Sequence, residues 1–229
     1  MNEFLLNRIE KRYRCKNRAE LSDILNNNYK EIFHNEGKIT KIMTVYFNTE
    51  SRLDSRKTIR SKIYINDMFN NIESALDETP CDLQVKFGCS KDGISVIKEK
   101  NTTYGKVINQ LKDVENSNND FKSDIMEYIK KLTSNQNLSP FMKIYYCRHY
   151  YIGEIEQNEI RITVDEDIVF ENCLTNEKKT LNESIMEIKA EKNESFDEDV
   201  LASAIETIFK KACIQRSTSK KMLGYTLVM

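Results

Sequence analysis

Ionisable and hydroxyl side chains recur at every second residue in several short stretches of this sequence. In residues 159–165, Arg161, Thr163 and Asp165 alternate with three aliphatic residues. Side chains two positions apart share one face of a β-strand. This strand would therefore present an aliphatic face and a face with a guanidinium, a hydroxyl and a carboxylate. We expect Asp165 to hold the guanidinium of Arg161, so that it can bind an oxyanion.

The same alternation places further charges on single strand faces. The cations are Arg8, Arg12, Arg60, Lys62, Lys86, Lys98, Arg148, Arg161 and Lys189. The acids are Glu10, Asp165, Glu187 and Glu191. Like charges in one enclosed space repel each other unless an anion lies between them. A linear polyanion such as a triphosphate or polyphosphate meets that requirement, and the carboxylates suit a divalent metal ion with oxygen ligands.

The period of the apolar residues predicts the elements that carry these side chains. A two-residue period predicts eight strands, at residues 5–14, 39–48, 58–66, 82–87, 94–100, 141–152, 159–165 and 184–191. A helical period predicts amphipathic helices at residues 18–27, 102–114, 120–132 and 197–212. The stretch 171–182 is polar and is predicted to be a connection. No repeat or linker divides the chain, so we expect a single domain over residues 1–229.

Two architectures fit these elements. Eight antiparallel strands can close into a barrel, with the charged faces lining the lumen and the helices packed outside. Charges that alternate with aliphatic residues are also typical of the wet face of a two-layer α/β sandwich. The pattern alone leaves both open.

Composition excludes several other classes of protein and site. The chain has 35 Lys+Arg and 36 Asp+Glu, so its net charge of −1 does not indicate binding to nucleic acid or to a membrane. No apolar run approaches 18 residues, and no signal peptide opens the sequence. The six cysteines are scattered, which is typical of reduced thiols in a cytoplasmic protein. There is no glycine-rich phosphate loop and no G-x-S-x-G motif.

Six segments, in order along the chain, resemble the VTC domain, the catalytic domain of the vacuolar transporter chaperone polyphosphate polymerases. They are RIEKRY (8–13), TVYFNT (44–49), YCR (146–148), RITVD (161–165), MEIK (186–189) and STSK (217–220). That domain belongs to the triphosphate tunnel metalloenzymes, or CYTH-like group. The resemblance implies the α+β class and an eight-stranded antiparallel β-barrel, with a charged lumen and helices outside.

The resemblance also implies an activity and a set of site residues. The activity is transfer of the ATP γ-phosphoryl group to a growing polyphosphate chain, with Mn²⁺ or Mg²⁺ as cofactor. The implied catalytic residues are Arg60, Lys62, Lys86, Arg148, Arg161 and Lys189. The resemblance implies Lys98 and Lys220 as further phosphate ligands, and we expect the substrate-binding set to be Arg8, Arg12, Lys98, Lys220, Ser219 and Tyr146. The implied metal ligands are Glu187 and Glu10.

The sequence departs from the family pattern at three of these strands. Arg12 stands where the family usually has Lys, Lys62 replaces an Arg, and Gln84 stands where related sequences often have an acid. The expected partners are ATP and inorganic polyphosphate, without nucleic acid and with any membrane partner on a separate chain. Three rival functions stay open. One is hydrolysis of triphosphate or polyphosphate in the same tunnel, favoured if Glu10 or Glu191 activates water. The others are polyphosphate or nucleotide binding without catalysis, and a structural two-layer protein with no anion site.

Overall fold

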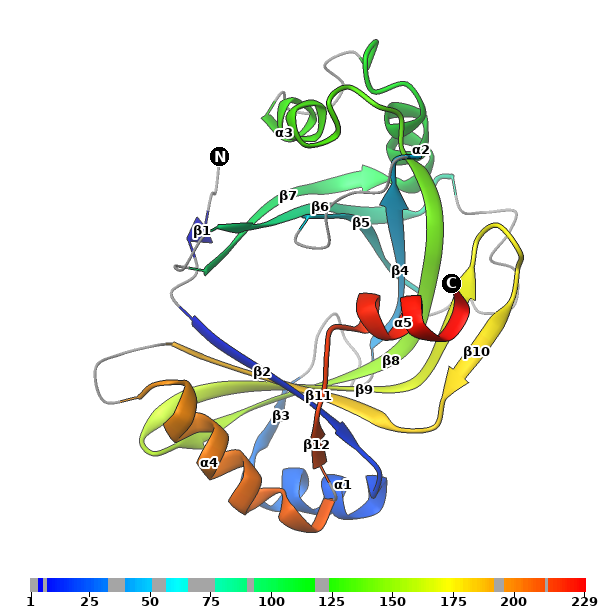
Figure 1. Ribbon diagram of the computed structural model, residues 1–229. Helices are drawn as coiled ribbons and strands as arrows, with labels where there is room; N and C mark the ends of the chain where they lie inside the picture. Colours follow the sequence, from blue (N-terminus) through cyan, green and yellow to red (C-terminus); the bar gives the residue numbers. More distant parts are fainter. Residues whose placement is uncertain are drawn as a thin grey trace. The chain divides into compact units, whose positions relative to one another are not determined.

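The structure of this protein is a computed structural model, shown in Figure 1. It describes residues 4–5, 8–32, 40–50, 57–65, 77–89, 93–117, 124–191, 196–212 and 214–229. Side chains are not described for residues 4–5, 8, 87–89, 93–101 and 124.

The chain divides into two compact units, which we describe one at a time. Unit 1 comprises Met1–Leu6, Ile42–Ile144 and Glu171–Glu177. Unit 2 comprises Asn7–Lys41, Tyr145–Phe170 and Lys178–Met229. The expected single domain over residues 1–229 stays a prediction.

Unit 1 contains an antiparallel sheet with two helices on one side. Its strands are neighbours in the order β1 (Phe4–Leu5), β7 (Gly93–Thr103), β6 (Pro80–Cys89), β5 (Lys57–Tyr64) and β4 (Thr40–Asn48). The helices are α2 (Tyr104–Lys112) and α3 (Asp124–Thr133), and both lie on the same side of β5, β6 and β7 (Figure 1).

The aliphatic residues of this sheet are buried, as the two-residue period predicts. Ile59 and Ile63 of β5 and Val85 of β6 have no exposed surface, and neither have Val107 and Leu111 of α2. Burying an aliphatic side chain of this size contributes about 1.5–3 kcal/mol. The opposite face of β5 and β6 therefore carries the polar residues of these strands.

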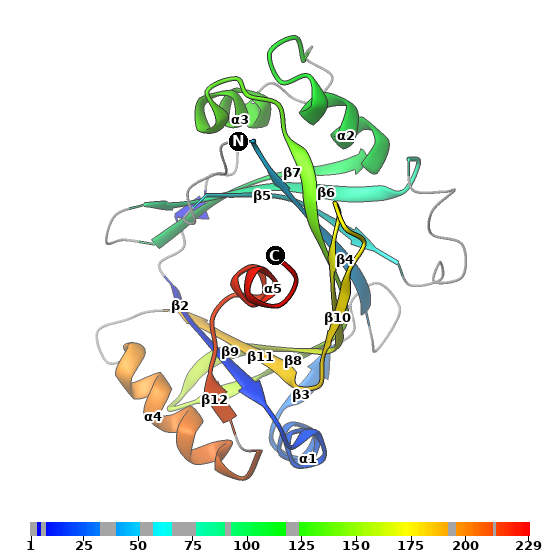
Figure 2. The ribbon, with the colours of Figure 1, turned by 45° about the vertical axis from the view of Figure 1, so that its right-hand side comes forward.

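Unit 2 contains a second run of antiparallel strands, with helices on both sides. In order, they are β8 (Ser139–Ile155), β9 (Asn158–Asn172), β11 (Ser184–Glu191), β2 (Arg8–Cys15) and β12 (Ile214–Arg216), while β3 (Lys30–Ile32) pairs with β8 and β10 (Lys178–Leu181) pairs with β9. The helices are α1 (Arg18–Asn28), α4 (Glu198–Ile208), the 3₁₀ turn η1 (Lys210–Ala212) and α5 (Lys220–Val228). Figures 1 and 2 show α1 and α4 on one side of these strands and α5 on the other.

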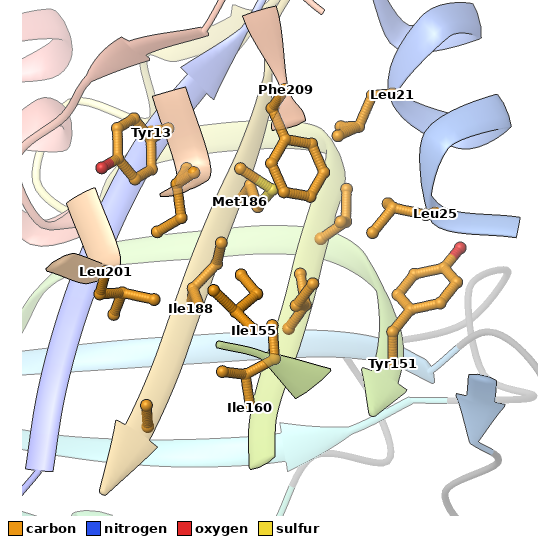
Figure 3. Packing of buried hydrophobic residues seen from close by; sticks show 14 of the residues in the cluster. Tyr13, Leu21, Leu25, Tyr151, Ile155, Ile160, Met186, Ile188, Leu201 and Phe209 are labelled. Atoms are coloured by element: carbon orange, nitrogen blue, oxygen red, sulfur yellow. The ribbon is translucent and has the colours of Figure 1, made fainter. Parts of the chain in front are cut away.

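The apolar face of unit 2 packs against α1 and α4. Figure 3 shows Met186 and Ile188 of β11 among Leu21, Leu201 and Phe209, all in one buried cluster. Because Met186 and Ile188 point to this core, the pleat turns Glu187 and Lys189 to the other face. The alternation of hydrophobic and charged residues thus fixes which face of each strand carries the chemistry.

The α+β class with an antiparallel sheet is confirmed, with differences in detail. Among the described residues, the strand pairings run from β1 to β12 as an open path and do not close into a ring. The short strands β1, β3, β10 and β12 and the helix α5 were not predicted. Strands of two to four residues are too short to show a period, and β10 lies in the stretch predicted to be a polar connection.

Candidate functional site

The register of three strands in unit 2 brings oppositely charged side chains into rows. On β11, Glu187 lies opposite Arg12 of β2 on one side and opposite Thr163 of β9 on the other. The next residue of that face, Lys189, lies opposite Glu10 of β2. Directly opposite residues of an antiparallel pair point to the same face and interact. The face therefore carries cations and carboxylates in alternation.

Glu187 is at the centre of the first group of ion pairs. Arg12 Nε donates to Glu187 Oε2 at 2.6 Å, and Lys189 Nζ pairs with the other carboxylate oxygen of Glu187. The second arm of the Arg12 guanidinium pairs with Glu10. Burial alone would raise the pKa of Glu187, but Lys189, Arg12 and other nearby cations lower that pKa well below its usual range. Glu187 is therefore a carboxylate at neutral pH.

Asp165 is at the centre of the second group. Arg148 grips its carboxylate with two hydrogen bonds, Nε to Oδ1 at 2.5 Å and Nη2 to Oδ2 at 2.8 Å. Lys220 Nζ, at the start of α5, pairs with the same Oδ2. The Asp165 side chain is only 1% exposed. Burial alone would raise the pKa of Asp165, but Arg148 and Lys220 lower it below 3.8.

Aromatic rings flank the two cations that Asp165 holds. Lys220 Nζ lies 4.2 Å from the ring centroid of Tyr146, and Arg148 Cζ lies 5.2 Å from the same centroid. The ring of Tyr150 is 5.9 Å from Arg148 Cζ. Burial lowers the pKa of Lys220, and Asp165 opposes that shift. Two cations beside a single buried acid leave one positive charge that an oxyanion can neutralise.

Thr163 adds a hydroxyl to this face. Its Oγ1 is buried and makes no hydrogen bond within the described part of the chain. Most buried hydroxyls in proteins have a partner. The position opposite Glu187 makes Thr163 a donor beside the carboxylate pairs.

In unit 1, Arg60 and Lys62 of β5 each contact a neutral side chain. Arg60 donates to Gln84 Oε1 from Nε at 3.1 Å and from Nη2 at 2.8 Å. Lys62 Nζ donates to the hydroxyl of Tyr64 at 3.1 Å and lies 4.7 Å from the centroid of its ring. Lys86 of β6 is half-buried on the same face as Arg60.

The predicted site residues thus fall into groups. Unit 2 brings together Arg12, Arg148, Lys189, Lys220, Tyr146, Glu187 and Glu10. Unit 1 holds Arg60, Lys62 and Lys86 on one sheet face. Ser219 forms the N-cap of α5, where its hydroxyl accepts a hydrogen bond from the backbone N–H of Met222 at 3.3 Å. The side chains of Arg8 and Lys98 lie outside the described part of the structure.

One expectation about these residues was wrong. Asp165 binds Arg148 and Lys220, and not Arg161. Arg161 lies opposite Lys189 on the same sheet, but its side chain is exposed. Arg161 and Asp165 are four residues apart on β9, which separates them by about 13 Å along the strand axis, whereas neighbouring strands are about 4.8 Å apart. A cation on the adjacent strand β8 therefore reaches Asp165 more easily than one on its own strand.

The residues Glu10 and Glu187 fit a divalent metal ion that arrives with a phosphate ligand. They come from neighbouring strands and meet at the guanidinium of Arg12. The described residues contain no group of three or more His, Cys, Asp or Glu that could hold a metal by themselves. Mg²⁺ is commonly held by one or two carboxylates together with substrate phosphates and water. The donor set fits this mode of binding.

The family of the chain follows from its whole sequence. The family model of the VTC domain matches residues 7–228. The chain belongs to the VTC domain family. No match was found among curated proteins.

Two solved structures share this fold although their sequences differ widely from this one. A putative adenylate cyclase from Bacillus halodurans superposes on this VTC domain with a TM-score of 0.55 at 10% identity, over 99% of this chain and 100% of that chain. The putative adenylyl cyclase HpAC1 from Hippeastrum gives a TM-score of 0.51 at 15% identity, over 96% of this chain and 95% of that chain. Both likenesses confirm the fold. In the described part of this VTC domain, none of the helices is long and apolar enough to span a membrane.

Two partners in this VTC domain were missed from the sequence. Gln84 binds Arg60, and Tyr150 flanks Arg148. The signal for Tyr150 was available, because it shares the parity of Tyr146 and Arg148 on one strand. The pairing of Gln84 depends on the register between β5 and β6, which the turn-forming residues do not determine.

Proposed function

We propose that this VTC domain is a polyphosphate polymerase, which transfers the γ-phosphoryl group of ATP to the end of a growing polyphosphate chain. The observation that carries the proposal is the charged face of unit 2, where buried or half-buried cations surround Glu187 and Asp165. Family membership supports the same substrate class. ATP and inorganic polyphosphate are its proposed partners, and a cytoplasmic location remains our expectation.

A protein catalyses phosphoryl transfer mainly by positioning the reacting groups and by neutralising the charge on the phosphoryl and leaving-group oxygens. Arg148 and Lys220 are suited to both roles, because Asp165 fixes their head groups while their combined charge exceeds its own. Glu187 likewise fixes the head groups of Arg12 and Lys189, although Glu10 also pairs with Arg12 and balances their remaining charge. In the proposed reaction these four cations bind the oxygens of the transferred phosphoryl group and of the leaving group.

A divalent metal ion completes the proposed site. Glu187 and Glu10 would hold Mn²⁺ or Mg²⁺, and the ion would supply positive charge to the phosphate oxygens. To do so, Arg12 would release these carboxylates and turn to the phosphate.

Glu187 and Asp165 are better suited to a phosphate nucleophile than to water. Glu187 and Asp165 both have a lowered pKa, so they are weak bases. Activation of water calls for a general base with a pKa near the operating pH. The terminal phosphate of an acceptor chain is already ionised and needs no such base. Hydrolysis would therefore need an acid other than Glu187 or Asp165 to activate water.

Hydrolysis of triphosphate is the second candidate. HpAC1, which shares the fold, is reported to have a dominant triphosphatase activity. The same cations would bind the triphosphate, and Glu10 or Glu191 would act on water. A non-catalytic polyphosphate-binding module is the third possibility that the experiment below separates.

The test is incubation of the purified protein with ATP and Mn²⁺, followed by gel analysis of the products. We expect polyphosphate from the wild type and none from Glu187→Gln, whose melting temperature should show that it still folds. Release of inorganic phosphate alone would assign the hydrolase. Retained affinity for tripolyphosphate with neither product would assign the binding module.

A further inference from the structure

The arginine of β5 differs from the arginines of unit 2 in the charge of its partner. Arg148 is bound to Asp165, and Arg12 is bound to Glu187. Arg60 is bound to the amide of Gln84, which is 4% exposed. The pairing is set by the sheet, because Arg60 and Gln84 lie directly opposite each other on β5 and β6.

The chemistry of the two groups fixes how the amide is oriented. A guanidinium has donors and no acceptor, so Gln84 must present its oxygen to Arg60. Gln84 Oε1 accepts both hydrogen bonds, at 3.1 and 2.8 Å. Its NH₂ group makes no hydrogen bond in the described part of the chain. The amide therefore positions the guanidinium and keeps two donors of its own beside it.

The surroundings of this pair are predominantly cationic. Lys62 and Lys86 share the face, which points away from the apolar side that α2 covers. The acid Asp82 lies opposite Lys62, one row of the β5–β6 ladder away from Arg60. Three cations and one acid leave a net charge of +2 on these residues.

We infer that Gln84 is a positioning residue that holds Arg60 without neutralising it, so that this face of β5 and β6 binds phosphate groups without a metal ion. The inference rests on the proposed function, because it assigns a role to the same phosphate-binding residues. It also separates two modes of binding. The two carboxylates Glu187 and Glu10 of unit 2 meet at one guanidinium and call for a metal ion with the phosphate, whereas the described side chains around Arg60 are three cations, one carboxylate (Asp82) and the amide of Gln84.

The experiment is calorimetric titration of the full chain with tripolyphosphate, first in EDTA and then with Mn²⁺. We expect wild-type protein to bind in EDTA. Gln84→Glu should weaken that binding about tenfold to a hundredfold, because the new carboxylate neutralises Arg60 and repels phosphate at close range. Gln84→Leu removes the anchor but keeps the charge of Arg60, so its loss should be several times smaller. Thermal melting confirms that each variant folds.

A second readout separates charge from shape. Binding by Gln84→Glu should depend less steeply on KCl concentration than binding by wild type, because one charge fewer is screened. Gln136→Glu, an isosteric change at an exposed position, is the matched control and should bind as wild type does. Equal losses in Gln84→Leu and Gln84→Glu, an unchanged salt dependence, or wild-type binding only with Mn²⁺ would overturn the inference. Absence of binding under both conditions would instead overturn the proposed function itself.

Discussion

Asp165 connects two cations that come from distant parts of the chain. Arg148 lies on β8 and Lys220 begins α5, and both bind a carboxylate that is 1% exposed. Neither cation is more than 13% exposed. A buried acid with two cationic partners is costly to remove, because the cations stay behind without compensation.

We therefore predict that Asp165→Asn lowers the free energy of unfolding by about 3–5 kcal/mol, the range for breaking a buried ion pair. The asparagine keeps the shape of the side chain, so the loss reports on charge. Asp167→Asn is the matched control on the same strand, because the Asp167 side chain is 71% exposed in its pair with Arg18. It should change stability by no more than about 1 kcal/mol. Urea denaturation measures both, and equal effects would contradict the role given to Asp165.

The same residue predicts a dependence of stability on pH. The folded pKa of Asp165 lies below its ordinary value of 3.8, since Arg148 and Lys220 outweigh the effect of burial. The unfolded chain then takes up the proton first as the pH falls, so the stabilisation is complete above about pH 5 and is lost through the folded pKa. The stability difference between wild type and Asp165→Asn should narrow from pH 7 to pH 3. A constant difference in urea denaturation would refute this assignment.

For single residues, the sequence predicts which strand face carries a charged side chain, but it does not predict the partner of that side chain. Parity along the strands placed Glu187 and Lys189 on the charged face, and the structure has them in contact. β8 and β9 are consecutive strands joined at Glu156 and Gln157, so their pairing could be expected, but the residue of β8 that reaches Asp165 depended on their register, which the alternation alone does not determine. Arg161 shows the same limit of the sequence pattern. Its position in the alternation places it on the charged face, but its side chain is exposed.

Among the elements, α5 has the largest consequence for the site. It begins directly after Ser219, so the N-cap and the site lysine Lys220 are adjacent. From the sequence alone, the segment that follows was interpreted as an apolar tail, because its apolar composition does not reveal the helix. The cap is the local signal that could have revealed it, since serine is a favoured N-cap residue.

We predict that Ser219→Ala destabilises the protein by about 1 kcal/mol, because the N–H of Met222 loses its acceptor. Ser219→Asn supplies another capping oxygen and should restore most of that loss. Thermal unfolding followed by circular dichroism compares the variants. Equal destabilisation by Ala and Asn would show that the cap is not the source of the effect.

The long strands were predictable for a different reason. Each of β2, β5, β9 and β11 runs for at least eight residues, which is enough for a two-residue period to emerge. The period works because one face packs against helices, as Met186 and Ile188 do against α1 and α4. A strand with both faces exposed would show no such period, because neither face would have to be apolar.

At the scale of the whole molecule, a net charge of −1 gives no sign of an anion-binding protein. The structure shows why the total misleads, because the cations gather on the charged strand faces while acids such as Asp167 and Glu198 lie outside them. The Bacillus halodurans protein shares the fold at 10% identity, so the fold does not require most of these residue identities. Substrate and reaction type depend on the site, so they need a direct measurement.

That measurement is the fate of the individual phosphates of ATP. The protein is incubated with Mn²⁺ and ATP that is labelled at either the γ- or the α-phosphate, and the products are separated and then treated with an exopolyphosphatase. We predict that the γ label enters a polymer that the exopolyphosphatase degrades, while the α label stays in ADP. Recovery of the γ label only as inorganic phosphate or pyrophosphate, or of the α label in a cyclic nucleotide, would contradict transfer of the γ-phosphoryl group to polyphosphate.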